Sequence, residues 1–266
     1  MKMTMWKYWV VFKKSFKSQM IYRSAMLGSI ASTVLSFGIQ LCLWYVLLGT
    51  SVHNGTSFTD MVIFVIVNAL VSTLTRSNIS TTIETAVVDG TIAMEIIRPI
   101  SYKYYLLSNI LGRNVFSVVT NVLPIAVIGA FFLIGAAVPA GASVLLFCLS
   151  AVLGVFLNFE LTYIFGLLAF RIQRCWFISW YQSALTTFFG GTAVPLWFYP
   201  EALQTVSSIL PFRYITFEPI NILLGRTPIE SAWFPLLCAG VWIAVLCLLD
   251  RLMWHSAVRG LTVNGG

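Results

Sequence analysis

The stretch SVLLFCLSAVLGVFLNFELTYIFGLLAF occupies positions 143–170 and contains one charged residue, Glu160. A helix needs about 20 consecutive apolar residues to cross the hydrocarbon core of a bilayer, so this stretch is long enough for one crossing. Hydrophobic residues make up 59% of the whole chain and charged residues 9%, whereas a soluble domain is about half apolar and about a quarter charged. No soluble core covers so much apolar surface. The composition therefore predicts an all-α protein that spans a membrane.

Five other stretches are long and apolar enough to act as spans. They occupy residues 25–50, 61–83, 107–137, 176–198 and 233–253. The second of these is the weakest, because Arg76 interrupts its apolar pattern. With the opening stretch they predict six transmembrane helices and one transmembrane domain over residues 1–266.

The positions of the basic residues predict how these spans are oriented. The chain has 16 lysines and arginines, and all but Arg213 and Arg226 lie near its two ends or beside the loops after the second and fourth spans. Arg76 is counted here with the nearer, inner side. Loops rich in lysine and arginine stay in the cytoplasm. The distribution predicts that both termini are cytoplasmic.

Residues 3–22 have the pattern of a helix that lies in the membrane surface. One face carries Met5, Trp9, Phe12, Phe16 and Met20. Lysines lie on the opposite face, where anionic lipid would attract them. The alternative is that this basic segment only orients the chain and forms no helix.

The segment between the fifth and sixth spans, residues 195–231, combines prolines with short apolar helical patterns. A solvated loop has no need of such patterns. They predict short helices that re-enter the outer face of the membrane. The alternative is a large external loop packed on the ends of the helices.

The sequence lacks the motifs of the common enzyme classes. It contains no Gly-Lys pair and so no Walker A motif, no His-Glu-x-x-His and no Gly-x-Ser-x-Gly. The two histidines, His53 and His255, lie far apart in the sequence. We therefore predict no catalytic residue, no metal site and no cofactor bound by this chain.

Polar residues inside the predicted spans are the candidates for a translocation path, since such groups usually face a partner or a water-filled cavity. They are Asn68, Thr73, Arg76, Asn121, Asn158 and Glu160. Arg76 and Glu160 lie at similar depth, which favours the hypothesis that they pair or line one cavity. The alternative is that Arg76 extends to the inner interface and Glu160 only makes structural hydrogen bonds.

A charged stretch, DGTIAMEIIRPISYKYY at residues 89–105, separates the second and third spans. Asp89 favours a helix start, and Pro99 favours a stop at Arg98. Ile92, Ile96 and Ile100 recur every fourth residue, while Glu95 and Arg98 are close enough to interact. The pattern predicts a short cytoplasmic helix, which either docks in a groove of a partner or lies on the membrane.

The order of these features resembles the permease subunit of a type-2 ABC transporter of the exporter class. The resemblance covers nearly the whole chain. Gly90 through Arg98-Pro99 is similar to a motif of one bacterial branch, and the ending Trp254…Arg259-Gly260-Leu261…Gly265 is similar to the tail of that branch.

The resemblance implies a multi-pass protein of the bacterial plasma membrane that moves an amphipathic drug, peptide or lipid outward. Separate ABC ATPase subunits would bind ATP and Mg²⁺, and a second permease, identical or related, would complete the membrane part; nucleic acid has no role. A coupling helix within residues 84–99 would contact the ATPase through the following residues: Asp89, Ile92, Glu95, Ile96, Ile97, Arg98 and Pro99. A standalone channel, an ion-coupled secondary transporter and a membrane scaffold remain alternatives.

Overall fold

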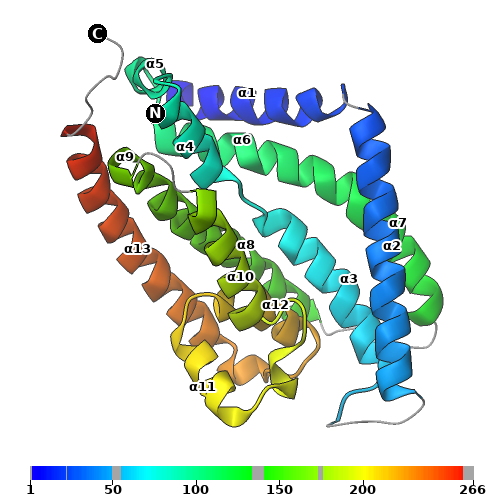
Figure 1. Cartoon of the computed structure of the whole chain (residues 1–266). Coiled ribbons are helices and arrows are strands. Elements are labelled where there is room, and N and C mark those ends of the chain that lie inside the picture. Colours follow the sequence, from blue (N-terminus) through cyan, green and yellow to red (C-terminus); the bar gives the residue numbers. More distant parts are fainter. Residues whose placement is uncertain (1, 22, 50–54, 134–140, 173–175, 260–266) are drawn as a thin grey trace.

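The computed structural model describes residues 2–21, 23–49, 55–133, 141–172 and 176–259. Within these ranges every regular element is a helix (Figure 1), which confirms the predicted all-α class. His53, Cys175 and the glycine-containing tail after Arg259 lie outside the described residues.

Five helical segments among the described residues are long and apolar enough to cross a membrane. They are α2 (Arg23–Leu48); α3 (Phe58–Thr75) with α4 (Ile79–Val88); α6 (Tyr102–Ser117) with π-helical η1 (Val118–Val122), α7 (Leu123–Ala130) and η2 (Phe131–Leu133); α8 (Gly141–Leu167) with α9 (Ala169–Ile172); and α13 (Trp233–Arg259). Their outward side chains include Val46, Leu145 and Leu252, each more than 60% exposed. Such a surface suits lipid as the solvent.

The predicted fifth span is shorter than expected. Its helix, α10 (Trp176–Phe189), has only 14 residues, so the predicted end at residue 198 is wrong. The helix stops because Gly190-Gly191 follows it, and Gly191 has a left-handed φ of 63°, which favours glycine. The chain then turns through η3 (Leu196–Phe198).

Two helices fill the segment between α10 and α13. In α12 (Arg213–Leu223), Ile215 and Ile220 are fully buried. This helix lies against Gly154 of α8, where an added Cβ would stand 2.5 Å from the Ile215 carbonyl oxygen. The segment is therefore packed into the bundle, and only the glycine allows so close an approach.

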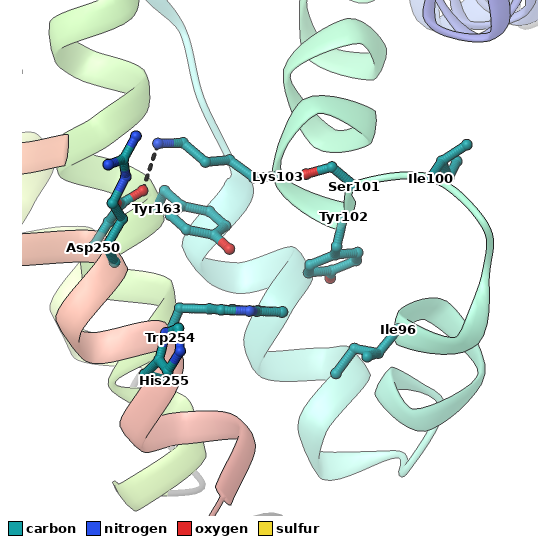
Figure 2. A pocket seen from close by; sticks show the side chains of 10 residues that line it. Ile96, Ile100, Ser101, Tyr102, Lys103, Tyr163, Asp250, Trp254 and His255 are labelled. Atoms are coloured by element: carbon teal, nitrogen blue, oxygen red, sulfur yellow. Dashed lines mark hydrogen bonds and ion pairs between the residues drawn. The ribbon is translucent and has the colours of Figure 1, made fainter. Parts of the chain in front are cut away.

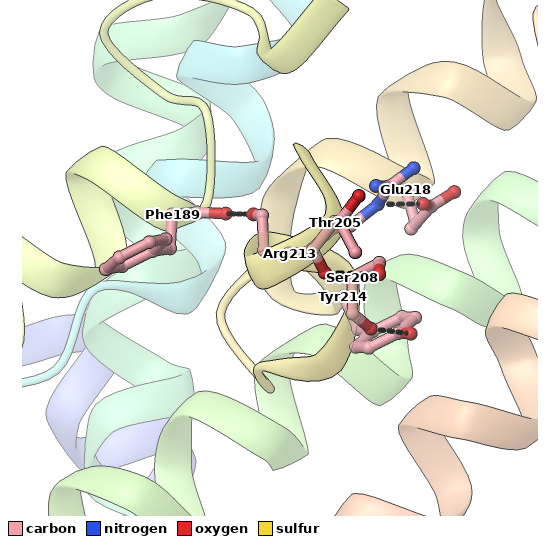
Figure 3. A network of polar contacts seen from close by, with 7 residues as sticks. Phe189, Thr205, Ser208, Arg213, Tyr214 and Glu218 are labelled. Carbon is pink, nitrogen blue, oxygen red and sulfur yellow. Dashed lines mark hydrogen bonds and ion pairs between the residues drawn. The ribbon is translucent and has the colours of Figure 1, made fainter. Parts of the chain in front are cut away.

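The other helix, α11 (Glu201–Ile209), is tied to its neighbours by side-chain hydrogen bonds (Figure 3). Ser207 donates to the Phe189 carbonyl at the end of α10 (2.6 Å), and the Tyr214 hydroxyl donates to the Ser208 carbonyl (2.6 Å). Arg213 and Glu218 form an ion pair within α12. Helix α11 is thus fixed at one end of the bundle by groups of α10 and α12.

The N-terminal helix α1 (Lys2–Gln19) runs across the end of the bundle and packs along α6 (Figure 1). At Gly112 an added Cβ would lie 2.4 Å from the Phe12 carbonyl oxygen. The Phe16 and Phe116 rings meet edge to face with centroids 5.3 Å apart. The predicted apolar face is therefore divided: Phe12 and Phe16 are half-buried towards α6, whereas residues such as Trp9 remain exposed.

Helix α1, the short helix α5 (Ile92–Ile97) and the C-terminal end of α13 share one end of the bundle, and α11 lies at the other (Figure 1). This shared end is the one that the charge distribution assigns to the cytoplasm. The side of the membrane on which it lies stays a prediction.

Candidate functional site

The region predicted as a coupling helix consists of three parts. Helix α4 continues out of the bundle to Val88, a turn follows, and α5 is a separate helix. Asp89 does not start a helix: it ends α4, where its backbone N–H donates to the Thr85 carbonyl and the Gly90 N–H donates to the Val87 carbonyl. The prediction failed because Gly90, with a φ of 72°, terminates α4 before the new helix begins at Ile92.

The apolar side chains of α5 divide between two directions. Ile92 is 2% exposed and Ile96 is half-buried, so both pack against the spans of this chain. Met94 and Ile97, three residues apart on another face, are 75% and 81% exposed. The predicted stripe of isoleucines thus faces inward, and Met94, which the sequence reasoning missed, joins Ile97 on the free surface.

The polar end of α5 agrees with prediction. The Glu95 carboxylate and the Arg98 guanidinium form an ion pair at 2.9 Å. The helix ends at Ile97, and Arg98 has an extended ψ of 139° before Pro99. Arg98 also lies over the Tyr105 ring, 5.7 Å from its centroid, which fixes α5 to the start of α6.

A buried ion cluster lies a few residues beyond α5 (Figure 2). The Lys103 ammonium of α6 contacts the Glu160 carboxylate of α8 at 2.7 Å. It also pairs with Asp250 of α13, and this pair is the one drawn in Figure 2. Both carboxylate side chains are 5% exposed. One lysine therefore joins three spans beside the short helix.

This cluster overturns the hypothesis that Arg76 pairs with Glu160. The ion-pair partner of Glu160 is Lys103, and the Arg76 guanidinium forms no ion pair with any described residue. The sequence places Lys103 in the charged stretch at residues 89–105, before the third predicted span. A usable signal was present, however: Asp250 is a second acid inside a predicted span and needs a cation.

An aromatic group borders the ion cluster. A cavity of about 420 Å³ is lined by Tyr102, Tyr163 and Trp254 as well as by Lys103 and Asp250 (Figure 2). The Trp254 ring stacks against Tyr102 and Tyr163, with centroids 6.2 Å and 6.4 Å away. Trp254 belongs to the C-terminal motif of the sequence, so that motif contributes to the end of the molecule that carries α5.

The second span is broken in its middle. Between α3 and α4, residues 76–78 are not helical, and their neighbours expose carbonyl groups. The Asn114 amide of α6 donates to the Leu74 and Arg76 carbonyls, both at 2.7 Å, and the Asn158 amide of α8 donates to the Thr75 carbonyl at 2.6 Å. Unpaired carbonyls are costly at membrane depth, so these two asparagines make the break stable.

A cavity of about 330 Å³ lies beside this break, and every side chain that lines it is polar. Helix α10 contributes five of the lining residues: Ser179, Gln182, Ser183, Thr186 and Thr187. The second span contributes Ser72, Thr75, Arg76, Ser77 and Ser80. Asn158, Thr192 and Thr216 complete it.

Three of the six predicted path residues meet at this polar cavity. Arg76 and Asn158 line it, and the Asn68 amide donates to the Thr192 carbonyl at 2.8 Å and accepts from Ser72. Thr73 is not among the lining residues. Their convergence was expected from polarity within the second and fourth spans, whereas the contribution of α10 was not.

The other two path residues lie elsewhere. Asn121 donates to the Ser29 hydroxyl of α2 at 2.9 Å, beside a smaller cavity of about 110 Å³. Glu160 belongs to the ion cluster described above. The predicted path thus corresponds to three separate polar places. The cavity at the break is larger than the one beside Asn121.

These features define an integral, multi-pass membrane protein with a polar cavity between its spans. Residues 33–265 match the family described as "ABC-2 family transporter protein". The chain therefore belongs to the ABC-2 transporter family, and the resemblance drawn from the sequence is confirmed. No curated protein and no solved structure matches it. Members of this family are membrane transport components that associate with ABC ATPase components and are not themselves catalytic.

Proposed function

We propose that this chain is the permease subunit of an ATP-driven exporter, which moves an amphipathic substrate outward. Hydrolysis of ATP, with Mg²⁺, takes place on a separate ATPase subunit. The observation that carries the proposal is the free face of α5: Met94 and Ile97 are exposed apolar side chains on a helix outside the bundle. Such a face suits a groove on a partner protein.

The connections of α5 support a mechanical role. On one side it follows α4 through a three-residue turn, residues 89–91; on the other it leads into α6, where Lys103 contacts α8 and α13. A displacement of α5 would therefore act on four spans at once. One of them, α4, leads directly to the polar cavity through Ser80 and Ser77.

The cavity also supports a second permease, identical or related, as a partner. Ser183 and Thr187 line it and are exposed on the surface of this chain. Arg76 is exposed beside them. Because such groups do not face lipid without cost, a second permease would cover this face, and the substrate would pass between the two.

The proposal is tested by association with an ATPase. A tagged chain is purified from its native membranes together with its bound proteins, and ATP hydrolysis is measured. We expect the wild-type chain to retain an ATPase and the double variant Met94→Asp/Ile97→Asp to lose it, because two carboxylates would enter an apolar contact.

The matched control is Ile209→Asp on α11, since Ile209 is also apolar and 68% exposed but lies at the opposite end of the bundle. It should retain the ATPase. If wild type and double variant retain the same amount of ATPase activity, the docking role of α5 is wrong. If the wild-type chain retains no ATPase and transports alone, the exporter proposal is wrong.

A further inference from the structure

The polar cavity beside the break has a lining that discriminates between classes of substrate. None of its lining residues is apolar, aromatic or acidic, although hydrophobic residues make up 59% of the chain. Ten of the lining residues listed above are serines or threonines, and the other three are two amides and one arginine. Such a surface offers hydrogen bonds and one positive charge.

Several of these groups have no partner among the residues that the structure describes. The Arg76 guanidinium and the hydroxyls of Ser183 and Thr187 make no hydrogen bond to any described residue, whereas Ser80 and Ser179 bond to each other at 2.8 Å. A cation at membrane depth without a counter-charge is costly. All three residues are exposed on the surface of this chain, so a ligand that enters from the surface can reach them.

The buried acids among the described residues are already engaged, and Asp250 shares Lys103 with Glu160. Glu160 pairs with Lys103 and Glu218 pairs with Arg213, so neither neutralises Arg76. A cationic ligand would therefore meet a positive charge without a carboxylate. An anion with oxygen acceptors would instead receive the planar guanidinium donors and the surrounding hydroxyls.

We propose that this cavity binds the anionic, oxygen-rich head group of the substrate, such as a phosphate or carboxylate, while the apolar part of the substrate stays outside the cavity. The inference rests on the proposed function, in that it assigns a substrate class to the proposed path. A volume of about 330 Å³ suits a head group and is at the small end of pockets that enclose whole drug-sized ligands.

The test measures binding to the full-length chain in nanodiscs of zwitterionic lipid, and so needs no ATPase. Three amphiphiles with the same tail are compared: dodecyl phosphate, dodecyl maltoside and dodecyltrimethylammonium. We expect dodecyl phosphate to bind about tenfold more tightly than the ammonium compound, since a charge-assisted hydrogen bond contributes this much. Equal or tighter binding of the ammonium compound overturns the proposal.

Variants locate the binding. Arg76→Gln should weaken dodecyl phosphate binding by about tenfold. Arg171→Gln is the matched control, because Arg171 is an exposed arginine that contacts Ser256 away from the cavity. Should Arg76→Gln bind dodecyl phosphate as wild type does, the cavity is not the site.

A second variant tests the site without removing a charge or an internal hydrogen bond. Ser183→Ala/Thr187→Val removes two exposed hydroxyls that make no hydrogen bond within the described chain, so folding should be unaffected. We expect dodecyl phosphate to bind about threefold more weakly, and unchanged binding contradicts the proposal.

Inorganic phosphate distinguishes the two possible sources of the anion. Competition by phosphate alone, at a concentration near that of dodecyl phosphate, assigns the site to free phosphate compounds; competition only by the dodecyl compound assigns it to amphiphiles. If the chain binds dodecyl phosphate through Arg76 but captures no ATPase, the site stands and the exporter proposal fails. If it captures an ATPase but prefers the ammonium compound, the reverse holds.

Discussion

Lys103 pairs with two carboxylates through one ammonium group. Its partners, Glu160 and Asp250, come from α8 and α13, and one oxygen of Asp250 has no hydrogen-bond partner within the described chain. Removing one member of a buried ionic group usually costs more than the group itself contributes, because the remaining charge stays buried. Lys103, Glu160 and Asp250 should therefore differ in how much their replacement destabilises the chain.

Replacement of the shared cation should be the most damaging change. We expect Lys103→Met to lower the free energy of unfolding by about 3–5 kcal/mol, since it leaves two buried carboxylates without a cation. Thermal unfolding of the purified chain in detergent measures this effect. Lys14→Met, at an exposed position of α1, is the control.

Removal of one acid should be mild by comparison. Asp250→Asn leaves Lys103 paired with Glu160 at 2.7 Å. It also removes a charge that is only partly satisfied, so we expect a loss of less than about 1.5 kcal/mol. The same unfolding assay decides: an Asp250→Asn variant as unstable as Lys103→Met would show that the cluster is not organised around the lysine.

At the scale of elements, the break between α3 and α4 depends on one side chain more than on any other described here. Asn114 satisfies two carbonyls of the second span, whereas Asn121, one helical segment further along, bonds to Ser29 and leaves its own oxygen unpaired. The two asparagines lie in the same span and are 7% and 6% exposed, so they form a matched pair for comparison.

We expect Asn114→Ala to destabilise the chain by about 2–6 kcal/mol, because each unsatisfied buried carbonyl costs about 1–3 kcal/mol. Asn121→Ala should cost less. Hydrogen exchange at residues 74–78 is the local readout, and it should quicken in the first variant only. Equal exchange in both variants would contradict the role given to Asn114.

The contact between α8 and α12 depends on the absence of a side chain at Gly154. Gly154→Ala would place a methyl group 2.5 Å from the Ile215 carbonyl oxygen, and we expect a loss of about 1–3 kcal/mol from overpacking. Gly240→Ala on α13 is the control, because nothing lies within 4 Å of its Cβ position. Thermal unfolding compares the two, and equal midpoints would mean that α12 moves away from α8 without cost.

The elements differ in how well sequence predicted them. Long apolar runs bounded by charges fixed the positions of α2, α8 and α13, because the requirement to satisfy the backbone in lipid leaves few choices. The short helix α5 was placed but its first residue was missed, since Asp89 and Gly90 carry competing signals for starting and ending a helix.

The sites were harder to predict because they depend on tertiary contacts. The polarity of Arg76 and Asn158 indicated a cavity, and the structure brings these two residues to its wall. The partner of Glu160 was not predictable from depth alone: Lys103 reaches it from the first turn of α6. No local pattern encodes that distance of 57 positions along the chain.

At the scale of the whole molecule, the two ends of the bundle should lie on opposite sides of the membrane. In a variant whose five cysteines are replaced by serine, a new cysteine at Ile97 should react with a membrane-impermeant thiol reagent only from the cytoplasmic side. One at Ile209 should react only from outside. Labelling of right-side-out and inverted vesicles tests this, and reaction of both positions from the same side would refute the predicted orientation.

The break in the second span also determines how force would travel if an ATPase docks on α5. Helix α4 has 10 residues and so forms a rigid rod about 15 Å long. Its far end adjoins the non-helical segment at residues 76–78, which would act as a pivot because α6 and α8 hold the carbonyls of residues 74–76. Rotation of the rod would swing Ser80, close to the pivot, through a much shorter arc than α5. The span would therefore convert a large displacement of α5 at the ATPase into a smaller displacement of the cavity wall, with a correspondingly larger force.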